Sequence, residues 1–266
     1  MKKAFTLIEL LVVIAIIAIL AAILFPVFAQ AKAAAKSSVD ISNLKQNATA
    51  FLIYSGDSDD YFPQAFQVGW GYPWPQTVQP YTKSFAIFRS PLDGTGQLKD
   101  TGSAEPTWAG IGISYGVNSY LDNTTSWPPI VAGPIAPMHL DWAGVKSTLS
   151  QTQMTDVAGT ILIADRFNSD QQKITPARLG NSSAWAGSFF CWRDYDGVEA
   201  GRVPDGTNPN KEISAYPNGA NGGVSVVNAG KANFAFTDGH TKSMSPPQTN
   251  PDAFNQKDKN LWNGLR

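Results

Sequence analysis

One carboxylate stands out among the residues that could do chemistry, because it lies inside an apolar stretch. Glu9 is the only ionisable residue between Ala4 and Phe28. A charged side chain in a membrane-length apolar helix costs roughly 2.5–3.5 kcal/mol at the bilayer centre and less near its edge, so such a residue usually marks a functional site. Glu9 is therefore the first candidate functional residue.

Three aspartates within four residues form a second candidate site. Asp57, Asp59 and Asp60 follow a predicted helix in the stretch GDSDDYFPQ. Calcium prefers hard oxygen ligands, and its binding loops often read D-x-D. Acidic residues are also common in ordinary turns, and the distal Glu of an EF-hand loop is absent. We treat Asp57 and Asp59 as candidate calcium ligands, with a plain turn as the alternative, and the sequence indicates no other cofactor.

The remaining reactive side chains do not suggest an active site. His139 has no second His or nearby Cys, as a zinc site would require. Asp238 and His240 could be an acid–base pair, but residues one apart in a strand or turn need not converge, and no nucleophile is identifiable. Cys191 is the only cysteine, which excludes an intramolecular disulfide and favours a buried free thiol, with an intermolecular bridge as the alternative. We expect no enzymatic activity.

Composition narrows the class of protein. The chain has 266 residues, enough for an anchor and one large domain or two small ones. A net charge of -1 and a pI near 6.1 argue against a nucleic-acid partner, which would leave a basic stripe. Only 15% of residues are charged, while Gly 23, Pro 18 and Trp 8 are typical of a loop-rich β domain with aromatic surface.

The element that positions Glu9 is an N-terminal apolar helix. The apolar run is ~24 residues, or about 36 Å of helix, which spans a bilayer with some tilt. Lys2 and Lys3 precede it, so the positive-inside rule places the chain after Phe28 outside the cytoplasm. An ordinary signal peptide would have a shorter apolar core, and Glu9 would have no role in it.

The helix is expected to continue beyond the apolar run. After Ala29 an apolar stripe with spacings of three and four predicts an amphipathic helix to about residue 55. Its members are Val39, Ile41, Leu44, Ala48, Phe51 and Leu52. The whole helix would be about 75 Å long, with one half in lipid or a filament core and the other half serving as the spine of a domain. Pro26 should kink or loosen it, and Gly56 should end it.

The chain after the helix predicts strands separated by long loops. Residues 111–121 and Val157–Asp165 are predicted as strands, the second one buried and central. A late meander of three antiparallel strands is predicted at residues 224–226, 232–236 and 241–244, with a type I′ turn at Asp238-Gly239.

Other stretches have weaker patterns. Residues 68–81 are rich in aromatic residues and have neither a helical nor a strand period. They could form an exposed ridge that binds carbohydrate or a neighbouring subunit. The alternative is a loop packed on the spine. Residues 85–88 fit a short strand or helical turn, and 166–222 a variable insertion.

The N-terminal residues Lys2-Lys3-Ala4-Phe5-Thr6-Leu7-Ile8-Glu9 resemble the leader and cleavage site of type IV prepilins and type II secretion pseudopilins. The resemblance implies cleavage by prepilin peptidase between Ala4 and Phe5 and N-methylation of Phe5. It also implies that Glu9 meets the new amine on an adjacent subunit, and Pro26 falls where many of these proteins have proline. Ala4 departs from the glycine that the family nearly always has.

The segment ANFAFTDGHTKSM resembles the end of a family of prepilin-like proteins. Their C-terminal, processing-associated domain is named for a His, nine spacer residues and Asp-Gly. In this chain the naming His falls at Asn228, and Ser90 stands where relatives often have Cys before Pro. If that His and Cys serve chemistry in relatives, this chain lacks it.

These observations predict an α+β fold in which a long N-terminal helix packs on an antiparallel β-sheet. The predicted parts are a leader (1–4), a transmembrane and assembly helix (5–28), an amphipathic spine (29–55) and an extracytoplasmic β-rich domain (56–266) with its meander at 223–245.

The predicted function is that of a subunit of a type IV pilus-like or type II secretion pseudopilus-like filament. Such a subunit lies in the inner membrane before assembly and in a periplasmic or surface filament afterwards. Its partners are itself, prepilin peptidase, the assembly machinery and the membrane. The alternative is a membrane-tethered extracytoplasmic binding module, for glycans through its tryptophans, that does not polymerise.

Overall fold

The structure is a computed structural model of the whole chain. It describes residues 6–65, 74–94, 113–122, 130–135, 148–167, 169–170, 188–189, 203–211, 219–227, 230–252 and 255–266. The leader, the cleavage pair Ala4 and Phe5, His139 and Cys191 lie outside these residues, as does most of the predicted insertion.

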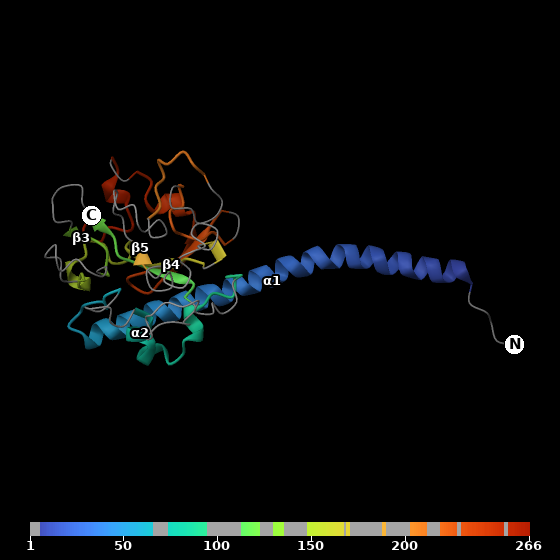
Figure 1. Cartoon of the computed structure of the whole chain (residues 1–266), viewed down its shortest axis with the longest axis horizontal. Helices are drawn as coiled ribbons and strands as arrows, with labels where there is room; N and C mark the ends of the chain where they lie inside the picture. The colour runs from blue at the N-terminus through green and yellow to red at the C-terminus, as the bar shows by residue number, and fades with distance from the viewer. Residues whose placement is uncertain are drawn as a thin grey trace, which may run out of the picture.

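A single helix, α1 (Leu7–Asp57, 51 residues), dominates the molecule and confirms the predicted long N-terminal helix. Pro26 lies inside it, and the helix continues on both sides of the proline without a break. Figure 1 shows a gently curved rod rather than a sharp kink. The hydrogen bond that Pro26 cannot make is therefore accommodated within a continuous helix.

The helix ends two residues beyond the predicted residue 55, and Gly56, which was expected to end it, lies inside it. Asp57 is its last residue, and Asp59 and Asp60 adopt left-handed φ values of 53° and 70°. The backbone N–H groups of Ser58 and Asp60 both donate to the carbonyl of Ser55, at 3.1 and 3.0 Å. Aspartate adopts the left-handed conformation more readily than most residues, so the aspartates make the turn that Gly56 was expected to make.

The main sheet has five strands in the order β5-β1-β4-β6-β7. They are β1 (Tyr115–Asn118), β4 (Ile161–Asp165), β5 (Ser188–Phe189), β6 (Ala232–Phe236) and β7 (Thr241–Met244). β1, β4, β6 and β7 form antiparallel neighbours, whereas β5 pairs in parallel with the edge of β1. β4 is buried along its whole length between β1 and β6, which confirms it as a central strand.

Smaller elements complete the fold. β2 (Leu121–Asp122) pairs with β3 (Ile130–Val131) in a separate two-stranded sheet. The short helices are α2 (Trp74–Thr82), η1 (Ala86–Phe88), η3 (Gln151–Gln153), η6 (Pro246–Thr249) and η7 (Lys257–Lys259). The position of η1 agrees with the helical-turn alternative for residues 85–88.

The predicted C-terminal meander is only partly correct. β6 and β7 form the expected hairpin, but residues 224–227 are not a strand. β6 already has β4 on one edge and β7 on the other, so residues 224–226 have no free edge of it to pair with. Ser225 instead donates its N–H to the carbonyl of Asp165, at 2.9 Å.

The hairpin loop also differs from the predicted type I′ turn. Gly239 has a φ of 88°, but Asp238 is not among the described residues with positive φ. The N–H of Gly239 donates to the carbonyl of Phe236 at 2.9 Å, and the N–H of Phe236 donates to the carbonyl of His240 at the same distance. This is a three-residue loop closed by a left-handed glycine, the next commonest hairpin form after the two-residue turns.

The aromatic stretch at residues 68–81 contains a helix that its pattern did not predict. α2 begins at Trp74, and its buried residues are Trp74, Pro75 and Val78. Proline is tolerated in the first turn of a helix because the N–H groups there have no helical partner. Trp74 is 1% exposed, so it belongs to the core and not to an exposed ridge.

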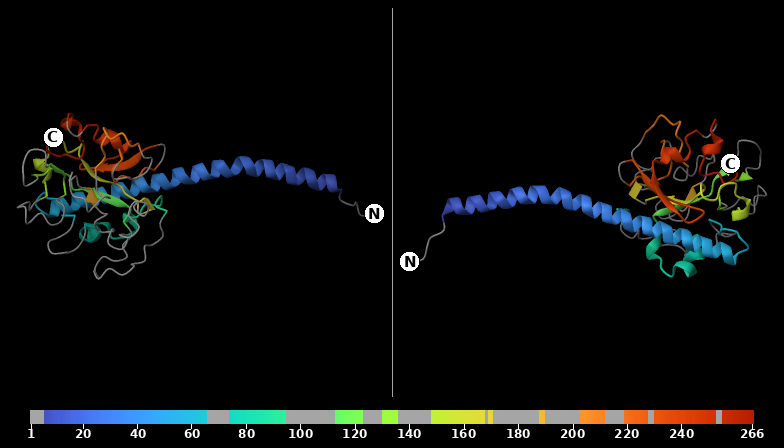
Figure 2. Two further views of the ribbon diagram at one scale, coloured as in Figure 1. Left: turned by 45° about the horizontal axis from the view of Figure 1, so that its top comes forward. Right: turned by 180° about the vertical axis from the view of Figure 1, so that it is seen from behind.

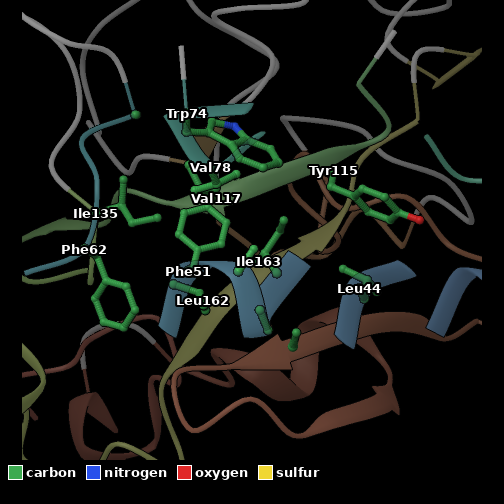
Figure 3. Packing of buried hydrophobic residues seen from close by; sticks show 14 of the residues in the cluster. Leu44, Phe51, Phe62, Trp74, Val78, Tyr115, Val117, Ile135, Leu162 and Ile163 are labelled. Atoms are coloured by element: carbon green, nitrogen blue, oxygen red, sulfur yellow. The ribbon is translucent and has the colours of Figure 1, made fainter. Parts of the chain in front are cut away.

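The spine half of α1 lies between the sheet and α2, as Figures 1 and 2 show. Leu44, Ala48 and Phe51 of the predicted stripe are fully buried, whereas Val39 is 51% exposed and so lies outside it. Figure 3 shows Phe51 close to Trp74 and Val117, and the ring centroids of Phe51 and Trp74 are 5.4 Å apart.

A second cluster of buried apolar residues includes side chains from β6 and from the C-terminal segment. Phe234 and Trp262 form an edge-to-face pair with ring centroids 6.3 Å apart. The indole N–H of Trp262 donates to the hydroxyl of Thr249 at 2.8 Å, so its polar atom is satisfied in the core. The contact between Phe234 and Trp262 therefore joins the C-terminal segment to β6 of the sheet.

Phe51→Ala tests the burial of the spine. Removing a buried phenylalanine side chain costs about 3–5 kcal/mol because a cavity remains. We expect this loss in the unfolding free energy of the domain, measured by denaturant titration of the full chain in detergent. Phe25→Ala is the matched control, because Phe25 lies on the same helix and is 71% exposed. Equal effects of the two substitutions would contradict the packing described here.

Candidate functional site

The first half of α1 is an uncovered apolar surface. Its large apolar side chains from Leu7 to Phe28 are between 47% and 77% exposed. Water-soluble monomers rarely expose contiguous apolar patches of more than a few hundred Å². This half of the helix therefore requires lipid or the helices of other protein molecules around it.

The shape of the molecule separates this surface from the domain. Figures 1 and 2 show the N-terminal half of α1 projecting as a lone rod from the folded part, with the N-terminus at its far end. In the described part of the chain, α1 is the one helix long and apolar enough to cross a membrane. Asp40 is the first fully buried residue along it. The helix thus has an exposed half and a half enclosed by the domain.

Glu9 lies in the first turn of this exposed half and closes a capping box with Thr6. The Glu9 carboxylate accepts hydrogen bonds from the backbone N–H of Thr6 at 2.8 Å and from its hydroxyl at 2.7 Å. The Thr6 hydroxyl in turn accepts a hydrogen bond from the N–H of Glu9 at 3.2 Å. A carboxylate is favourable here, because the N-terminus of a helix carries partial positive charge and unpaired N–H groups.

Thr6 is a functional residue that our sequence analysis missed. The spacing of Thr6 and Glu9 before an apolar run is the sequence signature of a capping box, so the signal was present. The structure places Glu9 in the first turn of the helix, four residues after Phe5 in the chain. Any new amine formed by cleavage before Phe5 would therefore arise close to Glu9 in sequence.

The aspartates at the other end of α1 are engaged in a turn. Asp57 lies near Tyr81, and after burial it is the next cause of the raised pKa of that tyrosine. A carboxylate oxygen of Asp60 accepts the N–H of Thr152 at 3.1 Å, which joins the turn to η3. Among the described residues, no three His, Cys, Asp or Glu side chains form a group that could hold a metal ion. Calcium binding by Asp57 and Asp59 remains a prediction.

Asp238 and His240 converge, which their spacing alone did not require. The Nδ1 atom of His240 lies 2.6 Å from a carboxylate oxygen of Asp238, and the same oxygen accepts the His240 backbone N–H at 3.0 Å. The His240 ring also stacks on Phe236 with centroids 4.2 Å apart. These contacts are internal to the β6–β7 hairpin and stabilise its loop.

A long helix that is half uncovered and apolar and half packed on an antiparallel sheet is the pilin-like arrangement of a filament subunit. The comparisons with known proteins agree. Residues 1–25 match the family model of the prokaryotic N-terminal methylation motif. The chain is 31% identical over 152 residues to the type IV major pilin protein PilA of Myxococcus xanthus (strain DK1622), covering 56% of this chain and 67% of that protein. No solved structure matches the chain.

The chain therefore belongs to the type IV pilin family. It is a structural pilin subunit and not an enzyme. Its N-terminal apolar helix anchors it in a membrane before assembly into a surface filament.

Calcium titration distinguishes the two roles of Asp57 and Asp59. A ligand that binds only the native state stabilises it by RT ln(1 + [L]/Kd). If Asp57 and Asp59 bind calcium, we expect a higher Tm of the full chain in millimolar calcium than in chelator, and we expect Asp59→Asn to remove the difference. Identical melting curves in calcium and in chelator would assign the two aspartates to the turn alone.

Proposed function

We propose that this chain polymerises through the exposed half of α1 to form an extracellular type IV pilus. The proposal rests on the continuous apolar surface from Leu7 to Phe28, whose large apolar side chains are 47–77% exposed. In the inner membrane lipid tails would cover this surface. In the filament the same surface would be covered by the equivalent helices of neighbouring subunits, with the domains outside.

Processing would prepare the helix to leave the lipid and enter the filament. The match of residues 1–25 to the methylation motif supports cleavage by prepilin peptidase between Ala4 and Phe5, and N-methylation of Phe5. Cleavage removes Lys2 and Lys3 with the leader and creates an amine that is positive near neutral pH. The mature helix would begin with this amine, close to Glu9.

Glu9 would then select the register of the subunits. In a single subunit Thr6 satisfies the Glu9 carboxylate. Between helices the carboxylate loses access to water, and an unpaired charge there is strongly unfavourable. An amine from the adjacent subunit removes most of that penalty, but only at the position where the two groups meet. The pair would therefore specify geometry more than it adds affinity.

The pilus is favoured over a type II secretion pseudopilus because the similar protein in Myxococcus xanthus is a major pilin. Prepilin peptidase and the pilus assembly machinery are then the expected partners.

The alternative of a glycan-binding tether has less support. Its argument depended on exposed aromatic residues, and Trp74 is buried against Phe51 and Phe88. A tether also gives Glu9 no role. The other aromatic residues of 68–73 lie outside the described part of the chain.

Processing is tested by the mass of the mature protein. We expect the membrane-extracted chain to begin at Phe5 with an added methyl group, as read by intact mass and N-terminal peptide mapping. Substituting Ala4→Glu should block cleavage, because the site requires a small residue. Detection of Met1 in assembled protein, or of a cut beyond the apolar run, would contradict this expectation.

The assembly role of Glu9 is tested with two substitutions. Glu9→Leu removes both the charge and the cap, whereas Glu9→Gln retains a side chain that can still cap the helix. We expect both variants to insert normally into the membrane and both to lose filament yield at least tenfold, because each 1.4 kcal/mol lost per contact weakens association about tenfold.

Filaments sheared from cells and seen by microscopy give the yield, and a blot of the membrane fraction gives the insertion control. Normal filaments from Glu9→Gln alone would assign the effect to capping. Normal filaments from both variants would exclude the ion pair.

A further inference from the structure

A buried polar cluster joins the spine half of α1 to three strands of the sheet. Asp40 of α1, Tyr115 of β1 and Asp165 of β4 are fully buried, and Asn233 of β6 is 1% exposed. Figure 3 shows the Tyr115 side chain pointing away from Trp74 and Phe51, with its hydroxyl at the margin of the apolar cluster. Filament assembly through the exposed half of α1 gives these four residues no role.

Three of the four carboxylate oxygens in this cluster accept hydrogen bonds from protein donors. Asp40 accepts the Tyr115 hydroxyl on Oδ1 and the Asn233 side-chain amide on Oδ2, both at 2.7 Å. Asp165 Oδ2 accepts the backbone N–H of Asn233 at 2.8 Å. Asp165 Oδ1 is fully buried and has no donor within the described residues.

The two carboxyl groups are neighbours, because Asn233 donates its side-chain amide to Asp40 and its backbone N–H to Asp165. Two buried carboxylates on one such neighbour repel, and each also loses its hydration. A single proton on one of them converts this repulsion into a strong hydrogen bond from a carboxylic acid to a carboxylate. A proton on Asp165 would also engage its Oδ1 atom, which no donor among the described residues reaches.

Cationic side chains also lie near this cluster. Arg166 follows Asp165 and is buried, and burial lowers the pKa of its guanidinium to about 9. The pKa of Asp165 is nevertheless raised, by burial first and then by the charge of Asp40. Lys36, one turn before Asp40, and Lys242 on β7 are exposed. Burial first, and then the charges of Asp40 and Asp165, raise the pKa of Tyr115 well above its usual value, so Tyr115 remains a neutral donor.

We propose that Asp40 and Asp165 share one proton and form a proton-dependent clamp between the spine helix and the sheet. This clamp is independent of the proposed filament contacts. Tyr115 and Asn233 orient Asp40 to receive the proton, and the Asn233 backbone orients Asp165 to hold it. A metal ion fits less well, because the Tyr115 hydroxyl, the Asn233 amide and the Asn233 N–H already occupy three oxygens.

The clamp makes the stability of the domain depend on pH. Burial, and then the charge of Asp40, raise the pKa of Asp165 well above its usual value, while the Asn233 N–H opposes this shift. The folded chain therefore keeps a proton that the unfolded chain releases above the ordinary carboxyl pKa. Stability from the clamp is complete below that value and is lost as pH rises through the folded pKa.

Asp165→Asn tests the shared proton directly. An asparagine amide can donate N–H to Asp40 and accept from Asn233, so it imitates the protonated acid without titrating. In the full chain in non-ionic detergent, unfolding in denaturant is measured between about pH 5 and pH 8, which brackets the region above the ordinary carboxyl pKa. As the pH rises, the unmodified chain should lose stability relative to the variant. We expect the ratio of their unfolding equilibrium constants, unmodified chain over variant, to increase by up to tenfold for each pH unit.

Asp258→Asn is the matched control, because Asp258 is exposed on η7 and should leave the pH dependence unchanged. Asp40→Asn should weaken the domain at every pH, because an amide cannot accept from both Tyr115 and Asn233. A parallel pH dependence of the unmodified chain and Asp165→Asn would overturn the proposal.

Infrared difference spectroscopy provides a reading that does not depend on the stability of a variant. The unmodified folded chain should show the carbonyl stretch of a buried neutral carboxylic acid near neutral pH. The band should be missing from Asp165→Asn if that variant folds. If the unmodified chain lacks this band, the proposal of a shared proton is wrong. If chelator lowers the stability of the chain and calcium restores it, a cation and not a proton lies between the two carboxylates.

Discussion

The rest of the structure depends on one continuous helix that must satisfy two different environments. From Leu7 to Phe28 the apolar side chains of α1 surround its whole circumference, which suits lipid or other helices. From Asp40 onward the buried positions lie between the sheet and α2. Because the helix is unbroken across Pro26, the position of the domain and the position of the apolar half are coupled.

Apolar periodicity predicted most of this arrangement. The spacing of Leu44, Ala48 and Phe51 identified the buried face of the spine, because positions three and four apart lie on one side of a helix. The apolar run within Val157–Asp165 identified the central strand, which begins four residues later than predicted, at Ile161. A strand covered on both faces is apolar along most of its length. Such signals are local and strong, so long-range information was not needed to interpret them.

The errors arose where pairing partners or polar contacts decide the structure. Residues 224–226 alternate as a strand does, but the neighbouring edges of β6 are occupied by β4 and β7, and the local pattern cannot reveal that competition. Trp74 began a helix in a stretch dominated by proline and aromatic residues, because packing on Phe51 overrides weak propensity.

The position of Asp40 in the buried polar cluster also could not be predicted from the local sequence. A single aspartate in a helix ordinarily indicates a solvent-facing position, and only the fold brings it to Tyr115 and Asn233. Those partners lie 75 and 193 residues further along the chain. No spacing rule within the sequence relates positions so far apart.

Because of its location, the buried polar cluster affects the direction in which α1 leaves the domain. Asp40 is the first fully buried residue of the helix, so its contacts with the sheet lie where the helix leaves the domain. At 1.5 Å per residue, the start of α1 lies about 50 Å from Asp40. A tilt of about 10° at that point would move the end of such a rod by roughly 9 Å.

That displacement is far larger than the tolerance of a hydrogen-bonded ion pair, which is lost when its atoms separate by more than a few tenths of an ångström beyond about 3 Å. In the proposed filament, Glu9 would therefore meet the N-terminal amine of the adjacent subunit only if every helix left its domain at the same angle. The polar contacts of Asp40 restrain that angle directionally, which the non-directional packing of Leu44 and Phe51 does less well. A stable angle at the domain thus becomes a condition for register at the opposite end of the helix.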